Sequence, residues 1–415
     1  FIRSETNAPG AGPYHGGSGP LHVADVSRDL HPICQDFIEA GRQAGLDRNP
    51  DFNGARQDGV GLYQLTVKDG LRMSTARAYL HPAMRRPNLQ VRTHAHATQV
   101  LCQAGRAIGV EYERGGRRLR AMANKEVILC GGAINSPQLL QLSGIGPCQV
   151  LQAAGIGIVC ESPAVGMNLQ DHIGVDYLFR SRKKTLNDEL HPWWGKLAAG
   201  MQYIAFRRGP LSLSVNQAGG FFKTAPDLAQ PNMQLYFSPV SYTRAAPGTR
   251  PLMNPDPFPA FLLGVSNCRP ASRGYVRVRS ADPFEAPEIQ PNYLSSQADM
   301  DELLQGVRLI RELARMPALA AIIEDELRPG RQCRTDEALA QDIRENAWSV
   351  FHPCSTCRMG PDPDTCVVDP RLRVHGMSNL RVADASIFPS LVSGNTNAAA
   401  IMVGEKAADL ILAGD

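Results

Sequence analysis

Apolar positions recur along the chain with two different spacings, and each spacing predicts a different kind of element. Apolar residues three or four positions apart predict helices at residues 31–46, 299–316 and 394–414. Short runs rich in β-branched and aromatic residues, separated by Gly and Asn, predict strands. These runs lie at residues 88–94, 97–103, 107–115, 117–130, 174–181, 219–224, 232–242, 260–268, 274–280 and 379–383. The strands from 174 onward predict a second, antiparallel sheet.

One strand leads directly into a helix through a glycine turn. After the apolar run that ends at Cys130, Gly131 and Gly132 predict a tight turn, and Asn135 or Ser136 is the expected N-cap. Pro137 fits the first helical position, and Gly144 the end of the helix. Backbone N–H groups and the helix dipole at such a junction can face an anion.

Composition and charge exclude several classes of protein. The chain has 415 residues, more than one compact core usually takes, so we expect two domains. Lys and Arg number 43 against 40 Asp and Glu, and a net charge of +3 does not predict a nucleic-acid partner. No apolar run reaches the roughly 18 residues of a membrane span. The ten Cys are scattered, which predicts reduced thiols in a cytoplasmic protein.

The segment "SVFHPCSTCRMG", residues 349–360, admits three chemistries. A zinc site needs about four ligands, and no second pair with ligand spacing follows Cys354 and Cys357. A redox dithiol is expected at a helix start in a thioredoxin-like unit, whereas this pair follows Pro353. We therefore expect no metal and two packing cysteines, while the residues alone leave His352 as either structural or catalytic.

Several long motifs in the same order resemble the glucose–methanol–choline (GMC) flavoprotein oxidoreductases. They are "HPCSTCRMG", "VVDPRLRVHGMSNLRVADASIFP", "SGNTNAAAIMVGEKAADLI", "GGAINSPQLLQLSGIGP", "VGMNLQDH", "GLRMSTARAYL" and "YHGGSGPLHV". The resemblance covers essentially the whole chain and is strongest to the choline dehydrogenase and bacterial alcohol dehydrogenase branch. The family's strand–GxGxxG–helix unit, which holds the adenosine diphosphate part of FAD, does not occur in this sequence. We therefore expect a chain truncated at its N-terminus.

The resemblance implies an α/β protein with an FAD-binding, doubly wound domain, incomplete at its N-terminus, and an antiparallel-sheet substrate-binding domain. Residues 1–90 would hold FAD-covering and substrate-domain segments, and residues 91–172 a segment of the FAD domain. Residues 173–345 would form the substrate domain, and residues 346–415 would return to the FAD domain with the catalytic residues.

The resemblance also implies the roles of individual residues. It places the family's active-site histidine at His352, as acid/base, and its second position at Asn395, which would orient the substrate oxygen. The helix N-cap is the alternative role for Asn395. Histidine suits proton transfer because its free pKa is about 6.5. Asp384 and Ala385 would lie near the flavin diphosphate and ribityl chain, Thr396 and Asn397 near the flavin pyrimidine ring, and Ala97 near adenine.

The function implied is oxidation of a primary alcohol to an aldehyde, with hydride transfer to N5 of FAD and electrons passed to a quinone or another non-oxygen acceptor. The alternatives are a choline dehydrogenase, an FAD alcohol oxidase that uses oxygen, and an inactive flavin-free fragment. Trp193 and Trp194 are the candidate aromatic faces for a trimethylammonium group. We expect a cytoplasmic protein, and leave open peripheral association with the inner membrane.

Four further histidines lie near these motifs. His94 and His96 alternate as a metal pair would, but no third ligand is near in sequence, so we expect exposed strand residues. His172 and His375 fall in motif turns, and we expect both to be structural.

Overall fold

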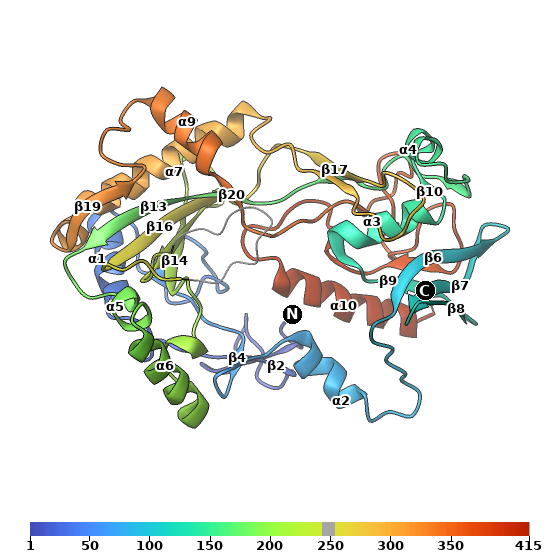
Figure 1. The fold of residues 1–415 in the computed structure, drawn as a ribbon, viewed down its shortest axis with the longest axis horizontal. Helices are drawn as coiled ribbons and strands as arrows, with labels where there is room; N and C mark the ends of the chain where they lie inside the picture. The colour runs from blue at the N-terminus through green and yellow to red at the C-terminus, as the bar shows by residue number, and fades with distance from the viewer. Residues whose placement is uncertain (243–253, 415) are drawn as a thin grey trace.

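The computed structural model describes residues 1–242 and 254–414, which form two lobes with a long helix between them (Figure 1). The left lobe in this view is built on a seven-stranded sheet, and the right lobe on smaller sheets and helix α3 (Gly132–Leu142). The C-terminal helix α10 (Asn397–Leu412) lies between the lobes. None of the helices in these two described ranges is long and apolar enough to cross a bilayer.

The large sheet is antiparallel throughout, with the strand order β19-β13-β16-β15-β14-β3, and β20 pairs with the other end of β13. Its strands are β3 (Gly59–Leu62), β13 (Ile173–Ser181), β14 (Ala218–Phe222), β15 (Met233–Ser238), β16 (Ala260–Asn267), β19 (Ile323–Arg328) and β20 (Trp348–Ser349). The antiparallel sheet predicted from residue 174 onward is therefore present, with contributions from other parts of the chain.

Helices cover one face of this sheet because alternate strand residues are apolar. Leu235 and Phe237 of β15 face the helices, and Phe37 of α1 (Ile33–Gln43) stacks on Phe237 with ring centroids 4.9 Å apart. The amphipathic helix α7 (Gln297–Arg315) lies along the same face, where Gly306 allows close approach to Met233. Helices α8 (Pro317–Ala320) and α9 (Asp336–Asn346) complete this layer.

The second lobe has its own apolar core. The meander β6 (His96–Gln103), β7 (Arg106–Arg114) and β8 (Arg117–Met122) lies beside the parallel pair β9 (Val127–Leu129) and β21 (Leu380–Val382). Helix α3 and one face of α10 pack into this core. The short 3-10 helix η3 (Ala385–Ile387) follows β21. Residues more than 250 positions apart thus form adjacent strands, as in Val127 beside Leu380.

The remaining elements are short and connect the lobes or cap their edges. They are β1 (Glu5–Asn7), β2 (Leu21–Val23), β4 (Val67–Lys68), β5 (Leu71–Arg72), η1 (Ala76–Leu80), α2 (His81–Ala83), β10 (Ile145–Gly146), α4 (Cys148–Ala153), β11 (Cys160–Glu161), β12 (Met167–Leu169), α5 (Leu186–Leu190), α6 (Trp193–Phe206), η2 (Pro210–Ser212), β17 (Gly274–Arg277) and β18 (Glu288–Gln290).

Four expectations about the elements were wrong in whole or in part. Residues 88–94 form no strand, and the predicted strand 117–130 is split into β8 and β9. The predicted strand at 274–280 does not join the large sheet, because β17 pairs with β12 and β18 in a separate three-stranded sheet. The strand predicted at 232–242 ends at Ser238, so its residues 239–242 lie outside β15.

Helix α3 begins four to five residues earlier than its capping signals predict. Its first residue is Gly132, and Pro137 lies inside it. A proline inside a helix leaves the carbonyl four residues earlier without its hydrogen bond. Here that carbonyl belongs to Ala133, and it accepts a hydrogen bond from the Thr356 hydroxyl at 2.7 Å. The helix therefore extends past Pro137 because a residue from the C-terminal segment replaces the missing donor.

Candidate active site

The structure brings His352 and Asn395 into direct contact. Nε2 of His352 and Nδ2 of Asn395 are 3.1 Å apart, although the residues are 43 positions apart in sequence. His352 follows the end of β20, where its backbone N–H donates to Asp171 at 2.7 Å. The Ser349 hydroxyl donates to the other oxygen of the same carboxylate. Asp171 thus fixes the turn that presents His352.

A hydrogen-bond chain through His172 defines the tautomer of His352. Nε2 of His172 is 2.9 Å from the carbonyl oxygen of Cys268 and must donate to it, since a carbonyl only accepts. Nδ1 of His172 then carries a lone pair and accepts from Nδ1 of His352, 2.9 Å away. The other nitrogen of His352, Nε2, is left unprotonated and accepts from the Asn395 amide.

Burial keeps both imidazoles neutral. Burial and, to a lesser extent, the neighbouring His172 together lower the pKa of His352 to about 4, and Asp171 only partly opposes this. Burial also lowers the pKa of His172, against the opposing effect of the Cys268 carbonyl. His352 is therefore an unprotonated base at neutral pH, and Nε2 is the nitrogen available for proton transfer.

Asn395 lines a cavity of about 530 Å³ between the large sheet and the start of α10. Its walls come from the face of the sheet opposite the helices, including Phe221, Gln234 and Tyr236, and from the loop before β3. Phe52 from that loop lies 5.4 Å from Phe221 and 5.6 Å from Tyr63, between ring centroids. The cavity is thus an aromatic and amide-lined space next to the only unprotonated nitrogen of His352.

Charge in this cavity is largely paired. Asp51 and Arg72 are its charged lining residues. The Asp51 carboxylate lies 2.8 Å from Nε2 of His15, whose Nδ1 lies 3.0 Å from Glu5. Partial burial alone would lower the pKa of His15, but the hydrogen bonds to Asp51 and Glu5 outweigh it and raise the pKa. His15 thus bridges two carboxylates, and its imidazolium, when formed, offsets part of the charge of Asp51, the carboxylate among the described lining residues.

The residues implied for cofactor contact lie at three places. Thr396 and Asn397 stand at the N-terminus of α10, next to Asn395. Asp384 and Ala385 lie at η3, where the Asp384 carboxylate accepts from Gly132 N–H at 2.9 Å, from the Ser136 hydroxyl at 2.6 Å and from Ser386 N–H at 2.8 Å. Asp384 is thus engaged with the starts of α3 and η3.

Ala97 lies on β6 at the rim of a cavity of about 360 Å³ between β6, β9 and α3. Its walls are mostly apolar and include Val110, Leu129 and Leu139, with Asn135 and Ser136 at the start of α3. A slot of this kind, next to backbone N–H groups, fits a planar aromatic ring attached to an anion.

Cys354, Cys357 and the histidines at 94, 96 and 375 do not line the cavity next to Asn395. Cys354 and Cys357 are fully buried free thiols in the core of the second lobe, and burial raises the pKa of Cys354 to about 12. His375 bonds to the Gly360 carbonyl. His96 is exposed on β6 and stacks on Phe284, whereas His94 precedes the strand. No group of three or more potential metal ligands occurs in the described parts of the chain.

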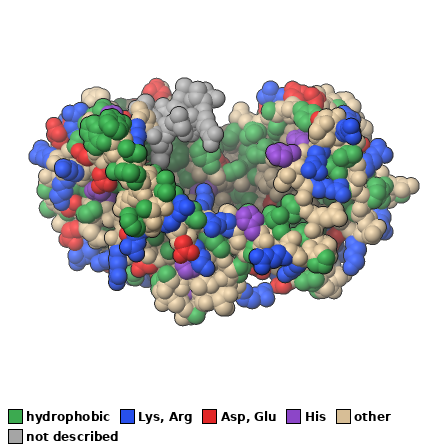
Figure 2. All heavy atoms as spheres, turned by 60° about the horizontal axis from the view of Figure 1, so that its bottom comes forward, with side chains coloured by type: hydrophobic (Ala, Val, Ile, Leu, Met, Phe, Trp, Pro, Cys, Tyr) green, Lys and Arg blue, Asp and Glu red, His purple; other side chains and the backbone are tan. Residues whose placement is uncertain are grey.

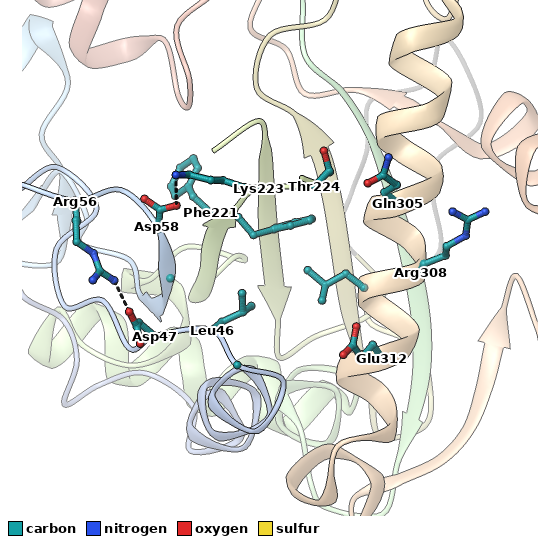
Figure 3. Close-up of a pocket in the computed structure, with 14 residues that line it drawn as sticks. Leu46, Asp47, Arg56, Asp58, Phe221, Lys223, Thr224, Gln305, Arg308 and Glu312 are labelled. Atoms are coloured by element: carbon teal, nitrogen blue, oxygen red, sulfur yellow. Dashed lines mark hydrogen bonds and ion pairs between the residues drawn. The ribbon is translucent and has the colours of Figure 1, made fainter. Parts of the chain in front are cut away.

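A second hollow lies on the helix-covered side of the large sheet (Figure 3). It holds about 430 Å³ between the segment after α1, strand β14 and helix α7. Two pairs of its charges are in contact, with Arg56 2.7 Å from Asp47 and Lys223 3.9 Å from Asp58. Its described lining residues include neither histidine nor cysteine, and we assign it no chemistry.

Comparison with known proteins identifies the family. GMC oxidoreductase family models match residues 4–174 and 270–404. The chain is 42% identical over 417 aligned positions to the oxygen-dependent choline dehydrogenases of Escherichia coli O139:H28 and Escherichia coli K12, covering 99% of this chain and 73% of theirs. The chain belongs to the GMC oxidoreductase family.

Solved structures of other oxidases share this fold. A pyridoxine 4-oxidase from Mesorbium loti superposes with a TM-score of 0.85 at 30% identity, over 99% of this chain and 75% of that one. A formate oxidase from Aspergillus oryzae gives 0.89 at 26% identity, over 99% and 77%. The α/β fold with an FAD-binding domain and an antiparallel-sheet domain is therefore confirmed, and the protein is an oxidoreductase. The four domain boundaries stay a prediction.

Two parts of this GMC site were not predicted as functional from the sequence. His172 was expected to be structural, yet it contacts His352 directly, and Asp171 anchors the His352 backbone. Both lie in the motif "VGMNLQDH". The two adjacent polar residues at its end, which follow a buried strand residue, were the signal in the sequence that could have indicated a functional role. Trp193 and Trp194 do not line the cavity next to Asn395, and they are 71% and 61% exposed on α6. They are therefore not part of this cavity.

Proposed function

We propose that the protein oxidises a primary alcohol to an aldehyde with FAD as its cofactor. The observation that supports this most directly is the contact between the unprotonated Nε2 of His352 and the Asn395 amide at the wall of the cavity. The family of the chain and the FAD enzymes among its structural neighbours support the same reaction class.

In this proposal His352 and Asn395 act on the same substrate oxygen. The alcohol hydroxyl donates to Nε2 of His352, which takes the proton as the carbon–hydrogen bond breaks. The Asn395 side-chain N–H donates to that oxygen and stabilises its developing negative charge. His172 holds the imidazole with Nε2 facing the substrate. Bound FAD supplies the hydride acceptor, N5 of the flavin.

The chain's own residues would hold the cofactor at the three places described above. The apolar slot beside Ala97 suits adenine. Asp384 already accepts from the N–H groups of Gly132 and Ser386, so its role would be to hold the starts of α3 and η3 in place beside the diphosphate and ribityl chain, next to Ala385. The N-terminus of α10 at Thr396 and Asn397 suits the pyrimidine end, where the helix dipole favours negative charge.

The substrate we propose is a neutral alcohol rather than choline. The aromatic side chains Phe52, Tyr63 and Phe221 offer faces to either kind of substrate. A quaternary ammonium also needs a counter-charge when it leaves water, and the cavity's carboxylate, Asp51, is held by His15. Choline is the second candidate because of the 42% identity to choline dehydrogenases.

The test replaces the proposed base in the FAD-loaded protein. We expect His352→Ala to lower kcat/KM by about 10²–10⁴-fold, because the hydroxyl proton loses its acceptor, while flavin absorbance is retained. Asn395→Ala should lower it by about 10²-fold. Alcohol oxidation is followed with a soluble quinone analogue under argon, and again in air with peroxide measured.

Cys354→Ala and Cys357→Ala are the matched controls, since both side chains lie in the same segment but are buried away from the cavity. They should reduce stability and leave kcat/KM nearly unchanged. Loss of turnover in the cysteine variants, with activity kept in His352→Ala, would contradict the proposed base. Peroxide formed at the full rate of turnover would make oxygen the acceptor in place of a quinone.

A further inference from the structure

A half-buried histidine lies directly behind the wall of the cavity next to Asn395. His15 belongs to the loop between β1 and β2, and carboxylates contact it on both sides. Its Nδ1 is 3.0 Å from Glu5 of β1, and its Nε2 is 2.8 Å from Asp51, which lines the cavity. This cavity lies between the large sheet and the start of α10, and Figure 2 shows the molecule hollowed between the two lobes. His15 has no part in the reaction proposed above.

The geometry determines the protonation of His15. A carboxylate only accepts hydrogen bonds, so each ring nitrogen that faces one must carry a proton. The amide of Asn7 fits this state. Its Nδ2 lies 3.0 Å from Nδ1 of His15, while its Oδ1 is buried and has no hydrogen-bond partner among the described residues. Turning this amide over would place the oxygen where the Nδ1 proton points. With both carboxylates bound, His15 is therefore an imidazolium.

The two carboxylates differ in burial. The side chain of Glu5 is 3% exposed and also accepts from the backbone N–H of Gly16 at 3.1 Å. The side chain of Asp51 is 30% exposed and opens toward the cavity. A buried charge costs more free energy without its partner than a partly exposed one does. A neutral imidazole has only one N–H, so we expect it to keep the bond to Glu5 and to release Asp51.

His15 is the group near this wall that changes its charge close to neutral pH. In the described part of the chain, Glu5 from β1 and Asp51 from the loop before β3 are the charged groups that act on it. Burial lowers its pKa, but the hydrogen bonds to the two carboxylates outweigh burial and raise the pKa above 6.5. Arg72 lines the same cavity and keeps its charge at every pH of interest. Loss of the His15 proton therefore adds one negative charge to the wall, at a pH above 6.5.

We propose that His15 sets the charge preference of the cavity for its substrate. While it is protonated it holds Asp51, and the cavity favours a neutral alcohol. When it loses its proton, Asp51 is released and becomes the counter-charge for an alcohol that carries a quaternary ammonium group. This inference rests on the proposed function, because it concerns which alcohol enters the same cavity.

The kinetic test compares choline with 3,3-dimethyl-1-butanol, its neutral isostere, in the FAD-loaded protein from about pH 6 to about pH 9. Neither substrate titrates in this range, and a change in the protonation of His352 affects both, so the ratio of their kcat/KM values reports the charge of the cavity. We expect the ratio to rise by about tenfold across the titration of His15. His15→Gln should make the ratio high and independent of pH, and Asp51→Asn should make it low and independent of pH.

A binding measurement separates this inference from the proposed reaction. Calorimetry with tetramethylammonium needs no turnover, and we expect its dissociation constant to fall by about tenfold over the same pH range in the parent and to stay level in His15→Gln. This shift in a protein that oxidises no alcohol would support the role of His15 and contradict the proposed function.

His81→Gln is the matched control, because this histidine is exposed on α2 and is not among the residues that line the cavity. It should keep the pH dependence of the parent. Glu5→Gln/His15→Gln removes the buried ion pair as a unit, so it remains testable where Glu5 cannot stay unpaired, and its ratio should also be independent of pH. The proposal is overturned if the tetramethylammonium affinity of the parent, or the ratio in an active protein, stays level or falls as pH rises. It is also overturned if His15→Gln keeps the pH dependence of the parent.

Discussion

At the scale of single residues, the chemistry depends on a pair of histidines. One of them determines which ring nitrogen of the other carries the proton. His172 is 180 positions from His352 in sequence and fixes it through one hydrogen bond between Nδ1 atoms. Without this partner, either nitrogen of His352 could carry the proton. With it, Nε2 is the base, and burial keeps it unprotonated far below the ordinary range of a histidine.

The pH profile of kcat/KM tests this arrangement. Because the pKa of His352 is lowered to about 4, the rate should stay level from pH 8 to about pH 5 and fall only toward pH 4. In His172→Asn the Nδ1 partner is lost, so kcat/KM should drop by about tenfold or more, and its midpoint should rise but stay below 6.5, because burial is the larger cause of the lowered pKa and remains. His375→Asn, a motif histidine that also bonds a carbonyl, is the control. An unchanged midpoint in His172→Asn would count against a positioning role.

The same lowered pKa affects stability in acid. Unfolded histidine binds a proton near pH 6.5, while folded His352 does so only near pH 4. Between these values the unfolded chain holds more protons at this residue than the folded chain does. The contribution of His352 to the free energy of unfolding therefore decreases as pH falls through this window and is constant above it.

At the scale of elements, helix α3 shows how one segment can complete another. Its first turn depends on Asp384, which accepts from Gly132 and Ser136, and on Thr356, which donates to the Ala133 carbonyl. Both partners come from the C-terminal segment that also carries His352. The capping signals near Asn135 and Pro137 are valid locally, but long-range hydrogen bonds outweigh them.

Thr356→Val tests this dependence. Thr356 is fully buried, and valine keeps its shape while removing the hydroxyl, so the Ala133 carbonyl loses its donor. We expect the free energy of unfolding, measured with denaturant, to fall by about 1–3 kcal/mol. Thr365→Val is the control, since that hydroxyl bonds to exposed Asp362 and its loss should change stability by less than about 0.5 kcal/mol. Equal losses in the two variants would contradict the proposed link.

At the scale of the whole molecule, the substrate cavity belongs to no single segment. Its walls come from residues 50–72, 214–236 and 392–399, which meet only where the large sheet faces the start of α10. The aromatic rings and amide side chains that line the cavity come together only when these segments pack against one another. The same is true of the contact between Asp51 and His15. The electrostatic character of the site is therefore a property of the assembled fold.

A comparison of choline with its neutral isostere 3,3-dimethyl-1-butanol tests that character. The two differ in charge and hardly in shape, and without a free carboxylate in the cavity we expect the neutral alcohol to have an equal or higher kcat/KM. A preference for choline above about tenfold would exceed what aromatic faces alone contribute in an exposed site. Asp51→Asn would then identify the counter-charge, since it should remove that preference.

The sequence by itself determined the family, most of the helices and strands, the packing role of Cys354 and Cys357, and the identity of the two residues that meet at the site. Periodic apolar positions and ordered motifs are local, and they survive without knowledge of the fold. The tertiary structure alone decided the tautomer of His352, the start of α3, the charge of the cavity and the exposure of α6. The first three depend on hydrogen-bond partners from distant parts of the chain. The exposure of α6 depends on which described residues pack against it. No local sequence pattern encodes either.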